Sequence, residues 1–134
     1  IVGGGQVGVE TALHLTGLGK KVTILEMQPE LAPDASKTHR DELMAEIKKQ
    51  AKLEIVTGAR CTAIVDDGVL YVKDDTPGKI NAGSIILSVG MRALTALADS
   101  FMGLTGEYAE IGDCAKVGTV EDATKTGWAA AMRL

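Results

Sequence analysis

The chain has 134 residues, of which 46% are hydrophobic and 24% charged, proportions typical of one globular domain; its 16 glycines cluster at turns without a short period, which rules out a collagen-like chain. A formal net charge of −4 at pH 7 leaves no basic surface of the kind that phosphate contacts require, so we expect no nucleic-acid partner. No apolar run approaches the roughly 20 residues that a membrane-spanning helix needs, so we expect no membrane partner either.

The first half of the chain alternates strand and helix patterns. Residues 1–2 end a buried strand, and 22–25 and 53–56 are rich in β-branched and apolar residues, as buried parallel strands are. Two stretches with apolar residues at helical spacing, 6–18 and 35–51, predict the helices between these strands. Strands that alternate with helices predict a parallel sheet with right-handed crossovers.

The pattern then changes to short strands joined by turns. Three antiparallel strands are expected at 59–65, 69–73 and 79–82. The sequence Asp-Asp-Gly at 66–68 is a hairpin signal, and 74–78 has the composition of a second turn. This segment therefore predicts a small antiparallel meander.

The last third returns to alternating elements. The run S-I-I-L-S-V at 84–89 predicts another buried strand, which ends at Gly90. A short helix is expected at 94–101, a short strand at 108–111 and a final helix at 121–134. The whole order predicts an α/β fold: a Rossmann-like central parallel sheet with flanking helices and an inserted three-stranded antiparallel meander.

A glycine-rich turn joins the first strand to the first helix. In Gly3-x-Gly5-x-x-Gly8, the first glycine allows a tight turn, the second lets the backbone approach a pyrophosphate, and the third lets the helix pack against the strands. The amides of Gln6 and Val7 then point at the anion from the helix N-terminus. The competing interpretation is a glycine-rich turn without a ligand, and the strand–turn–helix context argues against it.

Glu26 ends the second predicted strand, close to the spacing at which an acidic residue binds the adenosine ribose. A carboxylate repels a 2′-phosphate, and residues 27–32 contain no Arg, so NAD(H) is favoured over NADP(H). The alternative for Glu26 is an ordinary charged residue at a strand end.

Four strings carry a resemblance to a known family: I-V-G-G-G-Q-V-G-V-E at 1–10, I-I-L-S-V-G-M-R at 85–92, E-I-G-D-C-A at 110–115 and A-T-K-T-G-W-A-A-A at 123–131. They resemble the NAD(P)H-binding domain of the FAD- and NAD(P)-dependent, pyridine nucleotide-disulfide oxidoreductase-like superfamily, followed by its FAD-binding Gly-Asp motif. The resemblance implies a module that positions the nicotinamide for hydride transfer to FAD. It also implies a cofactor-binding set and no catalytic acid or base; the set is Gly3, Gly5, Gln6, Val7, Gly8, Glu10, Glu26, Met27, Val89, Gly90 and Asp113.

Within the superfamily, L-E-M-Q-P-E-L-A-P-D at 25–34 and I-G-D-C-A-K-V-G-T-V at 111–120 look most similar to the C-terminal half of 2-enoate and 2,4-dienoyl-CoA reductase-type enzymes. That resemblance implies that the parent enzyme reduces an activated C=C bond. It also implies an old-yellow-enzyme-like barrel with FMN and an iron–sulfur cluster in another part of the polypeptide. One departure is Ala93 after Arg92, where many members have Pro.

We expect the chain to be a piece of a longer polypeptide, with residues 1–105 as the NAD(P)H-binding domain. Residues 106–134 resemble the returning segment of an FAD-binding domain whose own first strand and glycine-rich turn are absent. The segment 108–111 is expected to extend the sheet beside 84–89, since an uncovered strand needs a partner. The isolated chain is expected to bind the nucleotide without turning over, and its partners are then the missing FAD and barrel domains.

Other residues predict no competing site. Cys61 and Cys114 form no C-x-x-C pair, which favours reduced thiols in a cytoplasmic protein over a zinc site. His14 and His39 have no partner at metal-ligand spacing. Two functional alternatives stay open: a non-catalytic NAD(H)-binding regulatory or redox-sensing domain, and an S-adenosylmethionine-binding domain, which would not need this glycine pattern.

Overall fold

The computed structural model describes residues 1–133, which form two compact units, one of residues 1–90 and one that begins at Met91. The final residue, Leu134, at the end of the expected last helix, lies outside the described residues. No helix in the described part of the chain is long and apolar enough to cross a membrane.

The first unit contains the expected parallel sheet. Strand β1 (Val22–Leu25) pairs in parallel with β2 (Leu53–Val56), in agreement with the bounds expected from the sequence. Val2 extends this sheet through parallel bridges to Leu25 on one side and Leu87 on the other. The carboxyl ends of these strands therefore meet at one edge of the sheet, where ligands of α/β proteins bind.

The segment 84–89 pairs less than a full strand would. The amide of Val2 donates to the carbonyl of Ile86 at 2.9 Å, and the amide of Ser88 donates to the carbonyl of Val2 at 2.7 Å. Within residues 1–133, Val2 is the partner of this segment, so the pairing covers a single bridge. The parallel direction agrees with the expected sheet, but the ladder is shorter than expected, and the expectation of a buried strand is wrong, because Leu87 and Val89 are 59% and 68% exposed.

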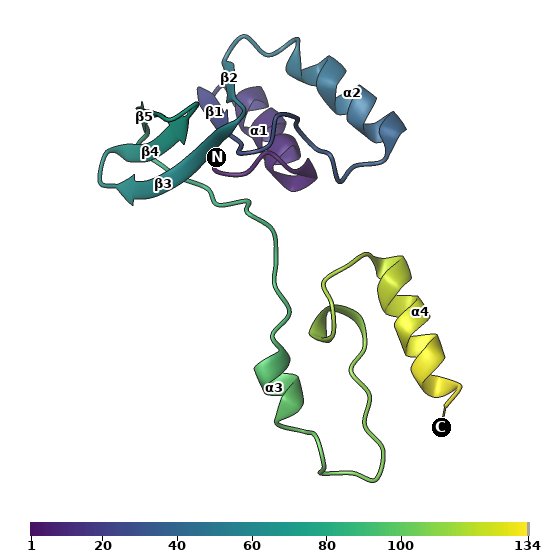
Figure 1. Ribbon diagram of the computed structural model, residues 1–134. Coiled ribbons are helices and arrows are strands. Elements are labelled where there is room, and N and C mark those ends of the chain that lie inside the picture. Colours follow the sequence, from purple (N-terminus) through teal and green to yellow (C-terminus); the bar gives the residue numbers. More distant parts are fainter. Residues whose placement is uncertain (134) are drawn as a thin grey trace. The chain divides into compact units, whose positions relative to one another are not determined.

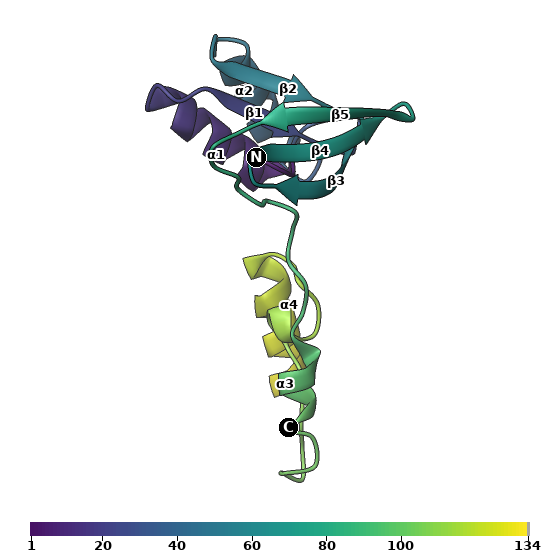
Figure 2. The same ribbon diagram turned by 90° about the vertical axis from the view of Figure 1, so that its left-hand side faces the viewer.

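Two helices cover the parallel strands. Helix α1 (Gln6–Gly17) lies beside β1 in both ribbon views, and the two elements share a core (Figures 1 and 2). Helix α2 (Lys37–Ile47) is shorter than the expected 35–51. Ser36 caps its start, because its side chain accepts from the amide of His39. The helix ends at Ile47, and the next amides, of Lys49 and Gln50, donate to carbonyls three residues earlier, as in a 3₁₀ turn. The buried core between these elements consists of Val9, Ala12, Val22, Ile24, Leu31, Ala32 and Leu43.

The meander forms a separate sheet in the order β3-β4-β5, all antiparallel. Strands β3 (Ala59–Val65) and β4 (Gly68–Lys73) agree with the expectation, whereas β5 (Thr76–Asn81) begins earlier than residue 79. The reason is a two-residue turn, in which Asp74 and Asp75 both adopt positive φ, of 49° and 58°. A second cluster of buried side chains joins this sheet to the parallel strands: Val2, Leu25, Ala59 and Val69.

The second unit is built from short helices. It contains α3 (Thr95–Asp99), the 3₁₀ turn η1 (Gly112–Cys114) and α4 (Val120–Ala131). A capping box between Thr119 and Asp122 starts α4, close to the expected residue 121.

The expectation of a strand at 108–111 is wrong. These residues belong to neither sheet of the described chain. A strand is stabilised by backbone hydrogen bonds to a neighbour, and this segment finds side-chain and turn contacts instead. The hydroxyl of Tyr108 donates to the carbonyl of Ala98, and the amide of Gly112 donates to the hydroxyl of Thr126.

Candidate functional site

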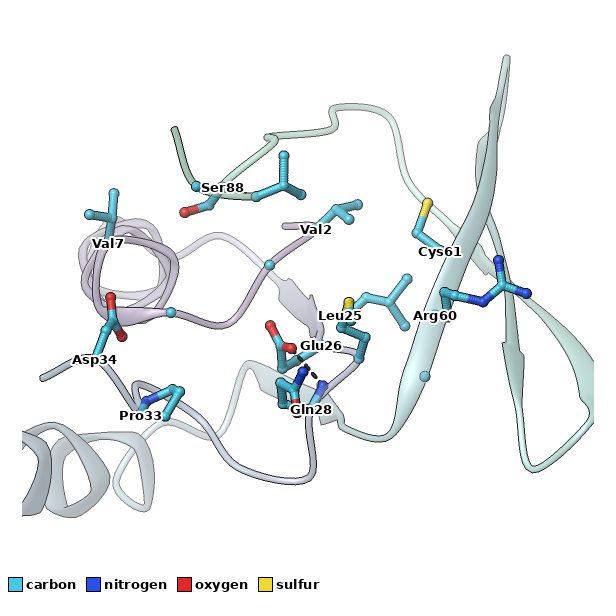
Figure 3. Close-up of a pocket in the computed structure, with 16 residues that line it drawn as sticks. Val2, Val7, Leu25, Glu26, Gln28, Pro33, Asp34, Arg60, Cys61 and Ser88 are labelled. Atoms are coloured by element: carbon cyan, nitrogen blue, oxygen red, sulfur yellow. Dashed lines mark hydrogen bonds between the residues drawn. The ribbon is translucent and has the colours of Figure 1, made fainter. Parts of the chain in front are cut away.

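An open pocket of about 460 Å³ lies at the carboxyl ends of the parallel strands, where Val2 and Leu25 lead into the glycine-rich turn and Glu26. Seven of the eleven residues of the expected cofactor-binding set line it; Gln6, Gly8 and Glu10 do not, and Asp113 belongs to the second unit. Figure 3 shows the pocket with Val7 of α1 at one end and Arg60 and Cys61 of β3 at the other. The seven expected residues are Gly3, Gly5, Val7, Glu26, Met27, Val89 and Gly90.

The glycine-rich turn leaves no room for side chains at two of its positions. Gly3 has φ of +103°, and a Cβ placed on it would lie 2.1 Å from the carbonyl oxygen of Ser88. A Cβ on Gly8 would lie 2.1 Å from the carbonyl oxygen of Gly3. The predicted steric roles, a tight turn at Gly3 and close helix packing at Gly8, are therefore confirmed.

Glu26 is 9% exposed, and its carboxylate joins the end of β1 to the turn. Oε2 accepts from the amide of Gly4 at 2.5 Å, and Oε1 accepts from the amide of Gln28 at 2.6 Å. A carboxylate has about four lone-pair sites, so these two bonds leave capacity for ligand hydroxyl groups. The sequence predicted the position of Glu26 at the pocket but not its two backbone partners.

Asp34 is a functional candidate that sequence reasoning missed. Its Oδ1 accepts from the amide of Gln6 at 2.9 Å, at the N-terminus of α1, and its side chain is exposed and lines the pocket. In Figure 3 it lies beside the first turn of α1. In the sequence, Asp34 was only the last residue of the string 25–34 that carried a family resemblance, with no role of its own, and no local pattern links two residues that are 28 positions apart.

Arg60 is the second residue that the sequence did not place at the site. It is the single positively charged side chain, Lys or Arg, among the described residues that line the pocket. It belongs to β3, whose first residue, Ala59, donates its amide to the carbonyl of Glu26 at 2.9 Å. Arg60 lies far along the chain from residues 27–32, and no local pattern in the sequence indicates that β3 approaches the end of β1. Cys61, beside Arg60, is a partly buried free thiol.

Glu10 lies on α1 away from the pocket lining and contacts α2 instead. Its Oε1 is 2.8 Å from Nε2 of His39 and accepts from the side-chain amide of Gln6 at 3.0 Å. The hydrogen bond with His39, and then the bond with Gln6, holds the pKa of Glu10 below its ordinary value. The same bond with Glu10 raises the pKa of His39, so the pair stabilises the α1–α2 contact when both groups are charged.

Asp113 lies in η1 of the second unit, where its Oδ1 accepts from the amide of Gly118 at 3.2 Å. The Gly-Asp pair therefore begins a 3₁₀ turn, and Gly112 adopts φ of +57° there. Its expected contact with FAD remains a prediction.

Comparisons with known proteins agree with this geometry. A NADH oxidase from Thermoanaerobacter brockii is 32% identical over 136 residues, which is 100% of this chain and 21% of that protein. A bilirubin reductase from Mediterraneibacter gnavus (strain CC55_001C) is 31% identical over 98% of this chain and 20% of its own. The structure of a 2-naphthoyl-CoA reductase with 2-naphthoyl-CoA matches 99% of this chain and 20% of its own, with a TM-score of 0.84 and 26% identity.

The chain thus spans about a fifth of the length of these three proteins. The family model described as pyridine nucleotide-disulphide oxidoreductase matches residues 1–113, which include the pocket and the glycine-rich turn. The chain belongs to the pyridine nucleotide-disulphide oxidoreductase family.

Proposed function

We propose that the chain binds NAD(H) in the pocket beside the glycine-rich turn, as the nucleotide-binding module of a flavin-dependent oxidoreductase. The observation that carries this proposal is the turn itself, where Gly3 and Gly8 admit no Cβ and the buried carboxylate of Glu26 lies at the adjoining strand end. A pocket of about 460 Å³ is within the range of small-molecule sites. These features fit the pyrophosphate and ribose of a dinucleotide.

Each part of the pocket has a role in this proposal. The N-terminus of α1, with the amides of Gln6 and Val7, holds the pyrophosphate, because amide groups and the helix dipole favour an anion there. The carboxylate of Glu26 accepts hydrogen bonds from ribose hydroxyls. Met27 and Val89 are 62% and 68% exposed, so their apolar side chains are available to pack on the rings of the ligand.

We favour NADH over NADPH because the fixed charge nearest the turn is negative. Glu26 is buried and held by two amides, so it stays in place and repels a 2′-phosphate. Arg60 acts in the opposite direction, since a guanidinium attracts phosphate, but it is exposed on β3, at the end of the pocket away from Val7 of α1 (Figure 3). The preference for NADH is accordingly moderate.

The parent enzyme, in this proposal, is a cytoplasmic oxidoreductase that reduces an activated C=C bond, as in enoates or dienoyl-CoA esters. The likeness to a protein named 2-naphthoyl-CoA reductase supports an acyl-CoA or related conjugated substrate. The nicotinamide supplies a hydride to FAD, while this chain supplies binding and orientation. Residues 106–134, with Asp113, belong to the FAD-binding domain, and an FMN barrel with an iron–sulfur cluster lies elsewhere in the polypeptide.

Calorimetric titration of the chain with NADH and with NADPH tests the proposal. Saturable NADH binding is expected, and Glu26→Arg should weaken NADH and strengthen NADPH. Glu54→Arg on β2 is the matched control, because Glu54 is exposed, pairs with Lys21 and does not line the pocket. If neither nucleotide binds to the chain, or if both Arg variants change affinity equally, the assigned site is wrong.

A further inference from the structure

The carboxylate of Asp34 occupies the anion position at the start of α1. It accepts the Gln6 amide at 2.9 Å, and its oxygens lie 3.4 Å and 3.5 Å from the place where a Cβ on Gly5 would be. Gly5 is the N-cap residue of α1 and has no side chain with which to cap the helix. A side chain from the loop between β1 and α2 therefore supplies the cap that the local sequence lacks.

A pyrophosphate at the same turn would compete with this carboxylate. Gly5 is the position where the backbone can approach a phosphate closely, and the carboxylate of Asp34 already lies against it. One amide hydrogen cannot be donated fully to two anions, and two anions in contact repel each other. The pyrophosphate and Asp34 therefore exclude each other at the Gln6 amide.

Of the two carboxylates at the turn, Asp34 is the one that can move. Glu26 is buried and accepts two amides, whereas Asp34 is exposed and accepts one. The loop is fixed just before it, since the amide of Ala32 donates to the carbonyl of Gly4 at 2.8 Å. Displacing Asp34 thus costs one charge-assisted hydrogen bond and leaves the rest of the turn in place.

We propose that Asp34 caps α1 in the free chain and is displaced by the pyrophosphate of the dinucleotide, so that it sets a limit on the affinity of the pocket. This inference rests on the proposed function. The carboxylate keeps the turn ordered when no nucleotide is bound, and the same charge opposes the nucleotide when it arrives. Asp34 acts as an affinity-determining residue of the site without taking part in the reaction.

The test is a calorimetric titration of the chain with NADH, in parallel for wild type, Asp34→Asn and Asp34→Ser. Both variants remove the charge and keep an oxygen that can cap α1, so the fold is expected to persist. NADH affinity should rise about two- to fivefold, the range expected for a charge at a helix N-terminus. Asp66→Asn is the control, because it removes the same charge from the exposed β3–β4 turn and should change affinity less than about twofold.

The outcomes separate this inference from the proposed function. Tighter NADH binding in both Asp34 variants, with Asp66→Asn unchanged, supports displacement. Binding by wild type that is equal or weaker in the Asp34 variants would overturn the inference and leave the proposed function standing, since Asp34 would then be compatible with the bound nucleotide. Absence of NADH binding in every protein, including the Asp34 variants, would overturn both.

Discussion

Replacing Glu26 with Gln should destabilise the first unit of the chain. The carboxylate accepts two backbone amides, at 2.5 Å from Gly4 and 2.6 Å from Gln28. A glutamine has one carbonyl oxygen, and its NH₂ group only donates, so one of the two amides must face a donor. A buried donor without a partner costs about 1–3 kcal/mol, and losing a charge-assisted bond lies in the same range. We expect the free energy of unfolding to fall by about 2 kcal/mol.

Urea denaturation followed by far-UV circular dichroism measures this effect, because the signal includes α1 and the strands of the first unit, whereas the single Trp of the sequence, Trp128, belongs to the second unit. With a slope of about 2 kcal/mol per M, the midpoint should fall by about 1 M. Glu54→Gln is the matched control, since that carboxylate is 59% exposed and its ion pair with Lys21 should contribute less than about 1 kcal/mol. An unchanged midpoint in Glu26→Gln would refute the account of Glu26 as the structural link between β1 and the turn.

Three further predictions follow from particular contacts. Gly8→Ala should lower the free energy of unfolding, measured by urea denaturation, by about 2 kcal/mol, because the new Cβ would lie 2.1 Å from a backbone oxygen. Gly17→Ala in the same helix is the control, since its Cβ meets no atom within 4 Å, and it should be neutral or stabilising. The bond to Glu10 raises the pKa of His39 above its ordinary value of 6.5, so protonated His39 should stabilise the fold below about pH 6.5, and this stabilisation should be lost as the pH rises through the raised pKa. An NMR titration in which Glu10→Gln leaves the titration midpoint of His39 unchanged would contradict this. Asp75→Gly should raise the free energy of unfolding in urea denaturation by about 0.5 kcal/mol, since Asp75 has φ of 58° in the two-residue turn; a loss would mean that the strain is already compensated.

The parts of the site that the sequence predicted are those specified by local patterns. A strand, a glycine-rich turn and a helix are consecutive in the chain, so the spacing of Gly3, Gly5 and Gly8 is enough to specify the backbone geometry of the turn. The end of β1 was likewise predictable, because its run of apolar β-branched residues stops at Glu26. Backbone sterics and side-chain period act over a few residues, and both can be read from the sequence.

Asp34 and Arg60 could not be placed in this way. Asp34 reaches the turn only because the loop after β1 folds back and hydrogen-bonds to the carbonyl of Gly4. Arg60 reaches the pocket because β3 follows β2 directly and its first amide bonds to the carbonyl of Glu26. Both placements depend on tertiary contacts between segments, for which hydrophobic periodicity carries no signal.

The errors in the strands have the same origin. Residues 108–111 were expected to pair, and a strand forms only where a neighbour supplies backbone donors and acceptors. The late start expected for β5, at residue 79, came from assigning Pro77 and Gly78 to the turn. Pro77 is accommodated in β5 because that strand is at the edge of the meander, paired only with β4 among the described strands, so its missing amide hydrogen costs no ladder bond.

The charges around the turn bear on how strongly a nucleotide can bind. In the free chain the amides of Gly4 and Gln6 are already bonded to carboxylates. Binding of a nucleotide in the proposed site would therefore replace the carboxylate of Asp34 with a phosphate at the Gln6 amide. The gain is the difference between a phosphate and a carboxylate at that helix end, which is smaller than the gain from an unsatisfied amide. Under the proposed function, most of the net affinity would then come from burial of the rings beside Met27 and Val89 and from ribose bonds to Glu26. Because Asp34 and Glu26 already hold the amides of the turn, the turn is ordered in the free chain, and part of the binding energy of a nucleotide would be spent on displacing Asp34.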